Sequence, residues 1–248
     1  MTTIYALWLR ELKRYRRSPI QLIVSLGQPV LYLLVLGFGL GPVFQKAGNG
    51  SYLQFVAPGV IGMTVLFSSV FNGVGLLWDR QFGFLKETLV APVARTHIVL
   101  GRTLGGATVS LLQGLIVFVI CLIAGLRPHH PLLLPVALLF MSLIAVLFAA
   151  IGTAIGSALR DMQGFQLIMN FLILPLFFFS NALFPTAGLP RPLQVAILLN
   201  PLSYGVAGMR QAFGGQADLG MLTEFAVLGT LARALLVVSS VLFSRIEL

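Results

Sequence analysis

Charged side chains are scarce in this chain. Only 9% of its 248 residues are Asp, Glu, Lys or Arg, and 58% are hydrophobic, whereas a soluble domain carries about 25% charged residues. The single cysteine, Cys121, excludes a disulfide framework. Because it lies within a hydrophobic run, we expect it to be a small buried apolar residue. The composition predicts an integral membrane protein.

Motifs that carry chemistry are missing as well. The chain has no G-x-x-x-x-G-K-[ST] or G-x-G-x-x-G nucleotide loop, no nucleophile elbow, and no metal-ligand spacing among its Cys and His residues. No acidic residue falls in the interior of a hydrophobic run, where ion-coupled carriers place their relay carboxylates. We therefore expect no catalytic site, metal or cofactor on this chain, and an energy source supplied by another protein.

Long uncharged runs dominate what is present. A transmembrane helix needs about 20 apolar residues, and the period-2 alternation of a membrane barrel is absent, which leaves helices. The sixth run contains Arg233, a costly residue in mid-membrane unless it is paired or reaches water; we favour structural pairing over substrate contact. The predicted fold is all-α with six transmembrane helices at Ile20–Phe44, Leu53–Leu77, Ile98–Leu126, Pro131–Leu159, Phe165–Leu183 and Met221–Phe243.

The basic residues indicate the topology. Those outside the predicted spans gather mainly in the N-terminal segment, the second and fourth loops and the C-terminus. By the positive-inside rule, both termini and residues 78–97 are cytoplasmic, and the protein lies in the cell's inner (cytoplasmic) membrane. The formal net charge of +9 is then a topology signal and a contact with anionic membrane lipids. We expect no nucleic-acid partner.

Two segments outside the spans have patterns of their own. Residues 1–17 combine an apolar face that includes Trp8 with a basic face, which predicts a helix on the cytoplasmic membrane surface. Residues 184–220 are broken by prolines yet strongly apolar at Leu193–Leu199, which is typical of a re-entrant segment at the outer face. No soluble domain is evident, so residues 1–248 are expected to form one transmembrane domain.

A charged island at residues 78–97 separates the second and third runs. On a helix, Trp78, Phe82, Leu85 and Leu89 fall on one stripe and the charges fall on the remaining surface. Pro92 then ends the helix, because proline disfavours helical geometry in the residue before it. We expect one helix along the membrane face that presents its charges to a soluble protein. A solvated helix without a partner is the alternative.

The chain contains two ordered blocks of motifs. The first block contains Phe55-Val56-Ala57-Pro58-Gly59, Trp78-Asp79-Arg80, Gly83-Phe84-Leu85-Lys86, Ala91-Pro92 and Leu100-Gly101-Arg102. The second contains Leu183-Phe184-Pro185, Leu189-Pro190, Leu193-Gln194, Asn200-Pro201-Leu202, Tyr204 and Arg210. With these two blocks the chain resembles a known family, the permease subunits of type-2 ABC exporters, and the nearest group is the daunorubicin-resistance-like drug-export permeases.

The resemblance implies a mechanism. A separate pair of cytoplasmic ABC ATPase subunits, which bind ATP and Mg, would grip a coupling helix between spans two and three, and a second permease copy or close paralogue would complete the assembly. Reversing the charges of Arg80 and Glu87 is then expected to uncouple ATP hydrolysis from transport. The residues implied to contact or couple to the ATPase are Trp78, Asp79, Arg80, Phe84, Leu85, Lys86, Glu87 and Pro92.

A substrate pathway is suggested by aromatic and amide side chains near helix ends, against which large hydrophobic molecules could stack. Each aromatic residue could equally face lipid or the core. The candidates are Phe67, Phe71, Asn72, Phe177, Phe178 and Asn181. The expected function is ATP-driven export of a hydrophobic drug or lipid-like compound. Export of polysaccharide or lipid-linked glycan, an ATPase-independent channel or carrier, and a non-transporting assembly factor are the alternatives.

Overall fold

The computed structural model describes residues 2–39, 41, 52–84, 93–159, 161–184, 186, 189–215 and 219–244. Within these ranges every regular element is a helix, which confirms the all-α prediction. The elements are α1 (Thr2–Arg16), α2 (Pro19–Gly39), α4 (Tyr52–Phe71), α5 (Val74–Gln81), α7 (Arg95–Ile123), η1 (Pro131–Leu133), α8 (Leu134–Ala158), α9 (Met162–Phe178), α10 (Arg191–Leu199), α11 (Pro201–Ala212) and α12 (Met221–Ser244).

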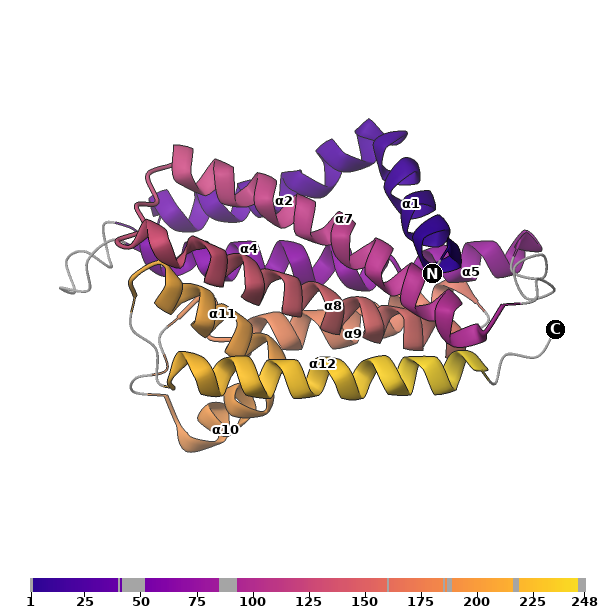
Figure 1. Ribbon diagram of the computed structural model, residues 1–248. Helices are drawn as coiled ribbons and strands as arrows, with labels where there is room; N and C mark the ends of the chain where they lie inside the picture. Colours follow the sequence, from indigo (N-terminus) through magenta and orange to yellow (C-terminus); the bar gives the residue numbers. More distant parts are fainter. Residues whose placement is uncertain are drawn as a thin grey trace.

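The long helices lie alongside one another and form an elongated bundle (Figure 1). At one end, α1 and α5 lie near the point where α12 finishes; at the other, α11 lies beside α12 and α10 lies at the lower edge of the bundle. The positions 2–16 expected to form a surface helix are helical, as α1. Its contact with a membrane surface stays a prediction.

Within the part of the chain that the structure describes, four helices are long and apolar enough to cross a membrane: Tyr52–Gln81, Arg95–Ile123, Pro131–Ala158 and Met221–Ser244. Two apolar stretches are shorter, Ser25–Gly37 in α2 and Met162–Phe178 in α9. A helix of 17 residues such as α9 spans about 26 Å at 1.5 Å per residue, somewhat less than a typical hydrocarbon core. A six-span layout therefore remains a prediction.

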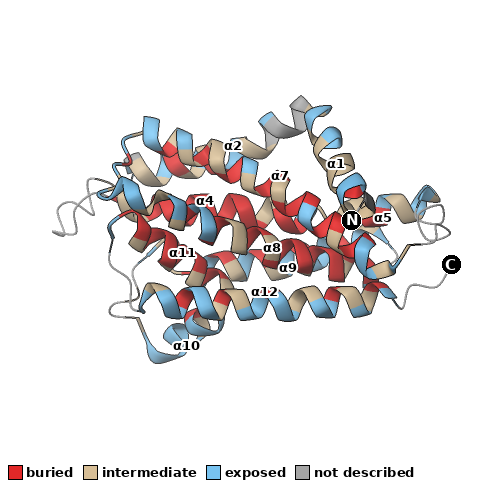
Figure 2. Ribbon diagram, viewed as in Figure 1, coloured by how far each residue is buried: buried red, intermediate tan, exposed pale blue. Residues whose placement is uncertain are grey.

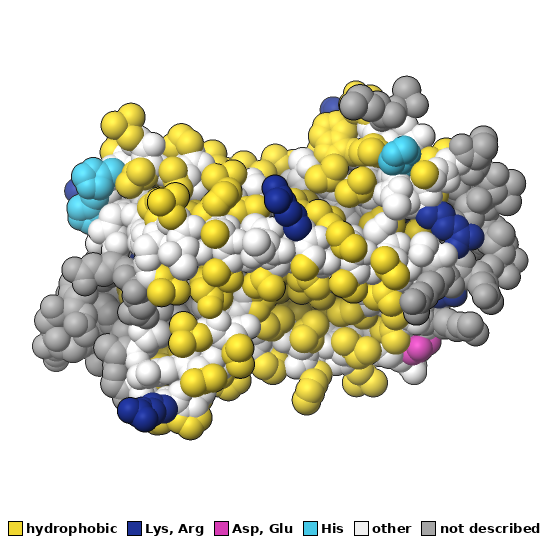
Figure 3. Space-filling view, turned by 60° about the horizontal axis from the view of Figure 1, so that its bottom comes forward, with side chains coloured by type: hydrophobic (Ala, Val, Ile, Leu, Met, Phe, Trp, Pro, Cys, Tyr) yellow, Lys and Arg dark blue, Asp and Glu magenta, His cyan; other side chains and the backbone are white. Residues whose placement is uncertain are grey.

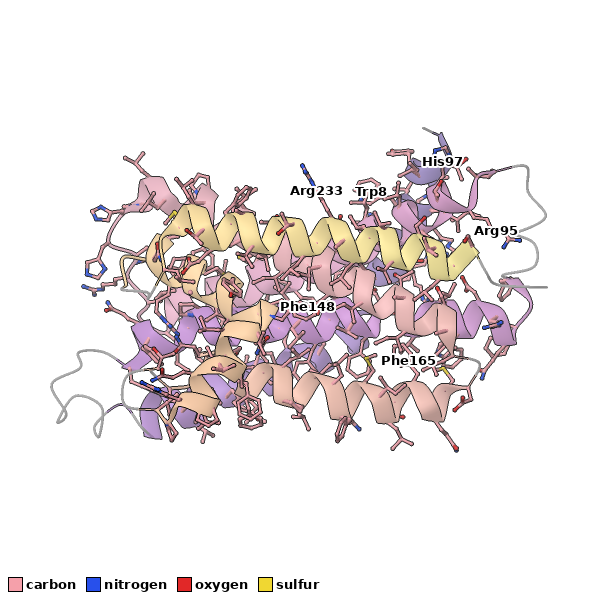
Figure 4. The ribbon with its side chains drawn as sticks, turned by 90° about the horizontal axis from the view of Figure 1, so that it is seen from below. Trp8, Arg95, His97, Phe148, Phe165 and Arg233 are labelled. Carbon is pink, nitrogen blue, oxygen red and sulfur yellow. The ribbon has the colours of Figure 1, made fainter. Side chains whose placement is uncertain are left out.

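The core of the bundle surrounds α4. Every residue from Val56 to Leu66 is buried, and buried positions concentrate in the middle layer of the molecule (Figure 2). Phe148 of α8 and Phe165 of α9 are fully buried and point into the space between helices (Figure 4). Cys121 is buried and unpaired, as expected.

Small residues bring helix backbones together. The α4–α5 turn at Gly73 lies directly on Gly152 of α8, because a Cβ at either glycine would overlap backbone atoms of the other segment. On α7, a Cβ at Gly101 would meet Leu7 of α1, and one at Gly105 would meet Glu11. Glycine at these two positions of α7 lets α1 approach it closely.

The outer surface is apolar along the bundle, with basic side chains mainly toward the two ends (Figure 3). Arg233 is the exception. It lies midway along α12, is exposed, and points away from the bundle (Figure 4). The expected structural partner is not present among the described residues.

The segment between α9 and α12 is largely helical where it is described; residues 185, 187, 188 and 216–218 lie outside the description. Asn200 joins its parts, because its Oδ1 accepts the backbone N–H of Leu202 at the start of α11 and its Nδ2 donates to the carbonyl of Phe179, just after α9. Gly205 and Gly208 then let α11 pack closely on α8. Whether this segment is re-entrant at the outer face of a membrane stays a prediction.

Exchange of Gly152 for alanine should destabilise the protein. The new methyl group would overlap the Val70 carbonyl, and relief of such overpacking costs about 1–3 kcal/mol. The melting temperature of the purified protein in detergent should fall. Gly229 in α12 is the matched control, since no atom lies within 4 Å of its Cβ position and alanine is the better helix former. Equal melting shifts for the two variants would contradict the backbone contact.

Candidate functional site

The charged island does not form the single helix expected over residues 78–97. Helix α5 ends at Gln81, and Gly83 adopts a φ of +81°, a left-handed conformation that glycine adopts without strain. The next described helix, α7, begins at Arg95. Leu85, Lys86, Glu87 and Pro92 lie outside the described residues, so their predicted contact with an ATPase has no structural account.

Aromatic side chains crowd the exposed end of α5. The Trp78 and Phe82 rings are stacked with centroids 5.5 Å apart, as the first turn of the predicted stripe requires. Phe82 is 62% exposed and Phe84 is 54% exposed. Exposed aromatic rings of this kind are enriched at protein interfaces and at membrane surfaces, so this end of α5 is a candidate docking surface.

Asp79 faces inward, and its carboxylate is shared by two arginines. Arg10 of α1 donates from Nη2 to Asp79 Oδ2 at 2.9 Å, and Arg102 of α7 donates to the same oxygen. The Asp79 side chain is 14% exposed and that of Arg102 is 8% exposed. Glu11 adds a second carboxylate, 3.4 Å from Arg10. We refer to Arg10, Glu11, Asp79 and Arg102 as the charge cluster.

The charge cluster joins three helices that are distant in sequence. A buried ion pair is weak evidence for stability, because desolvation offsets the attraction, but loss of one partner leaves a costly unpaired charge. The cluster therefore holds α5 in one position against α1 and α7. The sequence gives one indication of this cluster. Arg102 lies inside a predicted span, where an unpaired cation is costly, so a partner for it is expected.

Arg80 is also engaged within the chain. Its Nη1 donates to the carbonyl of Leu159 at 3.1 Å, immediately after the end of α8. Charge reversal at Arg80 would remove this bond from the end of α8 as well as altering the surface. Among the residues implied to contact the ATPase, Asp79 and Arg80 are thus engaged within the chain, whereas the Trp78 side chain is 43% exposed.

A cavity of about 450 Å³ lies beside α5, between α1, α2, α4 and α7, within the range of small-molecule sites. Its wall combines aromatic side chains with hydroxyl and amide groups. Glu11 and Arg14 supply the charges. Among the described residues, no group of three His, Cys, Asp or Glu side chains could hold a metal ion. The lining includes Arg14, Tyr15, Gln28, Phe67, Ser68, Phe71, Asn72, Trp78 and Gln113.

The residues predicted for a substrate pathway divide between the two ends of the bundle. Phe67, Phe71 and Asn72 line this cavity near the end of α4. Asn72 also fastens α4 to α7, because its Nδ2 lies 3.2 Å from the carbonyl oxygen of Gly106 and 3.3 Å from Ser110 Oγ. The other three residues, Phe177, Phe178 and Asn181, lie at the far end of α9, near α10 and α11 (Figure 1).

The far group has structural contacts of its own. Phe177 is fully buried and packs edge-on against Tyr32 of α2 at 5.9 Å. Asn181 has a φ of 55°, and its carbonyl accepts a hydrogen bond of 2.7 Å from Arg210. The Arg210 guanidinium lies over the Phe55 ring at 4.1 Å, a favourable cation–π contact. The six predicted residues therefore do not form one site.

Comparison with known proteins gives relatives over most of the chain. The inner membrane transport permease YadH of Escherichia coli K12 is 29% identical over 90% of this chain and 87% of its own length. The transport permease ycf38 of Pyropia yezoensis is 32% identical over 85% of this chain and 73% of its own length.

A third relative, Nodulation protein J of Rhizobium leguminosarum bv. viciae, is 26% identical over 90% of this chain and 86% of its own length. A family model described as ABC-2 type transporter matches residues 2–213, which includes α5, the charge cluster and the cavity. This match covers well over half of the sequence, and the chain belongs to the ABC-2 type transporter family.

Proposed function

We propose that this chain is the membrane subunit of an ATP-driven exporter of the daunorubicin-resistance-like group. Two copies, or one copy and a close paralogue, would span the inner membrane with six helices each and dock a separate pair of ATPase subunits that bind ATP and Mg. The observation that carries the proposal is α5: a short helix with exposed aromatic rings, fastened on its inner side to α1, α7 and α8.

These contacts suit α5 to transmit a force. Only the Asn72-Gly73 turn separates it from α4, the buried centre of the bundle. Gly73 rests on Gly152 of α8, and Asp79 is held by the two arginines. A partner that moves the Trp78–Phe84 end of α5 would therefore move α1, α4 and α8 with it, because close-packed helices shift as units rather than deform.

The cavity supports a lipid-like substrate rather than a flat hydrophobic drug. Hydroxyl and amide groups line it alongside the aromatic rings, and a wholly apolar ligand would leave the buried Tyr15 hydroxyl without a hydrogen-bond partner. An amphiphile can form hydrogen bonds with the polar groups of the wall and apolar contacts with its aromatic rings. A lipid-linked glycan, the second candidate, is favoured by the same polar lining.

The test of the function is reconstitution with an ATPase. The chain should co-purify with a co-expressed ABC ATPase subunit, and ATP hydrolysis by the complex in proteoliposomes should rise when a transported amphiphile is added. An ATPase-independent channel or carrier predicts no association with any such subunit. An assembly factor predicts association without substrate-stimulated hydrolysis.

The exposed aromatic rings of Phe82 and Phe84, directly after the end of α5, should be required for coupling. Replacing Phe82 and Phe84 with alanine removes contact area at the docking surface while leaving the charge cluster intact. We expect permease-dependent stimulation of the ATPase to fall about tenfold or more, as for loss of interface hot spots, with an unchanged melting temperature. Phe171→Ala is the control, because this ring is 85% exposed on α9 and does not belong to the docking surface. Equal effects of the two changes would refute the docking role.

Neutralising Asp79 should loosen α5. Asp79→Asn leaves Arg102 buried without a carboxylate, and we expect a loss of about 3 kcal/mol of stability, read as a lower melting temperature. Asp161→Asn is the matched control, since Asp161 is exposed and accepts from Gly164 as a helix cap, a role that Asn fills equally well.

A second substitution identifies the cause. Adding Arg102→Met to Asp79→Asn removes the orphaned charge, so part of the lost stability should return. If the double variant is no more stable than Asp79→Asn, the two side chains do not form an energetically coupled pair.

A further inference from the structure

The cavity wall changes in character from its mouth to its interior. Arg14, Gln28, Phe71 and Trp78 are exposed, and they mark the mouth. Gln113 of α7 is only 5% exposed and marks the interior. The mouth therefore offers a cation and aromatic rings, and the interior offers neutral groups that form hydrogen bonds.

One buried polar group of the interior lacks an ordinary hydrogen-bond partner within the described part of the protein. The hydroxyl of Tyr15 is buried and makes no hydrogen bond of ordinary distance and angle with the described residues, although it lies beside the Gln113 side chain. A buried polar atom without a partner costs free energy. An amide and a phenol together both donate and accept, which matches the hydroxyl groups of a ligand.

The mouth carries a net positive charge. Within the described ranges Arg14 forms no ion pair, and its guanidinium lies 3.0 Å from the Cβ position of Gly75, where a larger residue would displace it. The carboxylate of Glu11 is already engaged by Arg10. An oxyanion at the mouth would gain charge-assisted hydrogen bonds from Arg14.

We propose that this cavity binds the hydroxylated, anionic head of a membrane amphiphile. Its oxyanion would lie against Arg14, its hydroxyl groups against Tyr15 and Gln113, and its chains would remain in the lipid beside α2 and α4. Only the onward transport of this molecule rests on the proposed function. The binding step belongs to a single permease chain and requires neither ATP nor a second copy.

Trp78 provides a reporter for the test. The chain has two tryptophans; Trp8 points to Thr108, to which its Nε1 donates, whereas Trp78 lines the cavity. A full-length Trp8→Phe protein in phosphatidylcholine nanodiscs therefore reports on the cavity through Trp78 fluorescence. The probe is dihexanoyl phosphatidylglycerol, whose head carries one phosphate charge and hydroxyl groups. Dihexanoyl phosphatidylcholine, which has no net charge, tests whether binding requires a net negative charge. Glycerol 3-phosphate, which has no acyl chains, tests whether binding requires the chains.

We expect a saturable fluorescence change with the phosphatidylglycerol alone. Arg14→Gln should weaken its binding by about tenfold or more, as for loss of a hydrogen bond to a charged group. Tyr15→Phe, which removes only the hydroxyl, and Gln113→Leu should each weaken it several-fold. Arg16→Gln is the matched control, because Arg16 is an exposed arginine on the same helix outside the cavity lining, and it should bind the probe normally.

The proposal would be overturned by the lack of a saturable change, by equal binding of phosphatidylcholine, or by an equal loss of binding in Arg16→Gln and Arg14→Gln. Equal binding of glycerol 3-phosphate would show a soluble phosphate ester site and would reject the amphiphile. The outcomes are separable from those for transport. If the probe does not bind but ATPase coupling is intact, only the proposed binding site in the cavity is rejected. If the probe binds but no ATPase associates with the chain, only the proposed function is rejected.

Discussion

The carboxylate of Asp79 is the point on which the α1 end of the bundle depends. It is shared by Arg10 and Arg102, so a single anion holds two cations that come from helices far apart in the sequence. Arg102 is buried, and without Asp79 it would be an uncompensated charge among apolar helices. The interaction thus fixes the position of α5 relative to α1 and α7. The cavity, whose wall includes residues of all three helices, depends on the same contact.

The all-helical fold was largely predictable, because long uncharged runs in a sequence indicate membrane helices. The small size of Gly101, Gly105 and Gly152 permits the close contacts that the structure shows. The break in the helix at Gly83 was not predicted, because an isolated glycine costs a helix only about 1 kcal/mol, and no local sequence pattern indicates that its φ is positive. Arg233 was expected to have a partner, and none lies within the described part of the chain.

The candidate site was predicted less well, for two separate reasons. The partners of Asp79 lie 69 and 23 positions away, and no sequence spacing indicates such contacts. The direction of the predicted spans already indicates that Phe67 and Phe177 lie far apart. Consecutive spans alternate in direction, so the end of the second and the end of the fifth face opposite sides of the membrane. The direction of the runs alone would have separated the two groups.

The cavity and the docking surface share Trp78, and this has a thermodynamic consequence. Trp78 stacks on exposed Phe82 at one side and lines the cavity at the other. A partner that shifts α5 must then alter the shape of the cavity. By reciprocity, a ligand that favours one cavity shape must alter the affinity of α5 for that partner by the same factor. Stimulation of the ATPase by substrate would then follow from the position of Trp78 in both the cavity and the docking surface. It would require no coupling through more distant parts of the bundle.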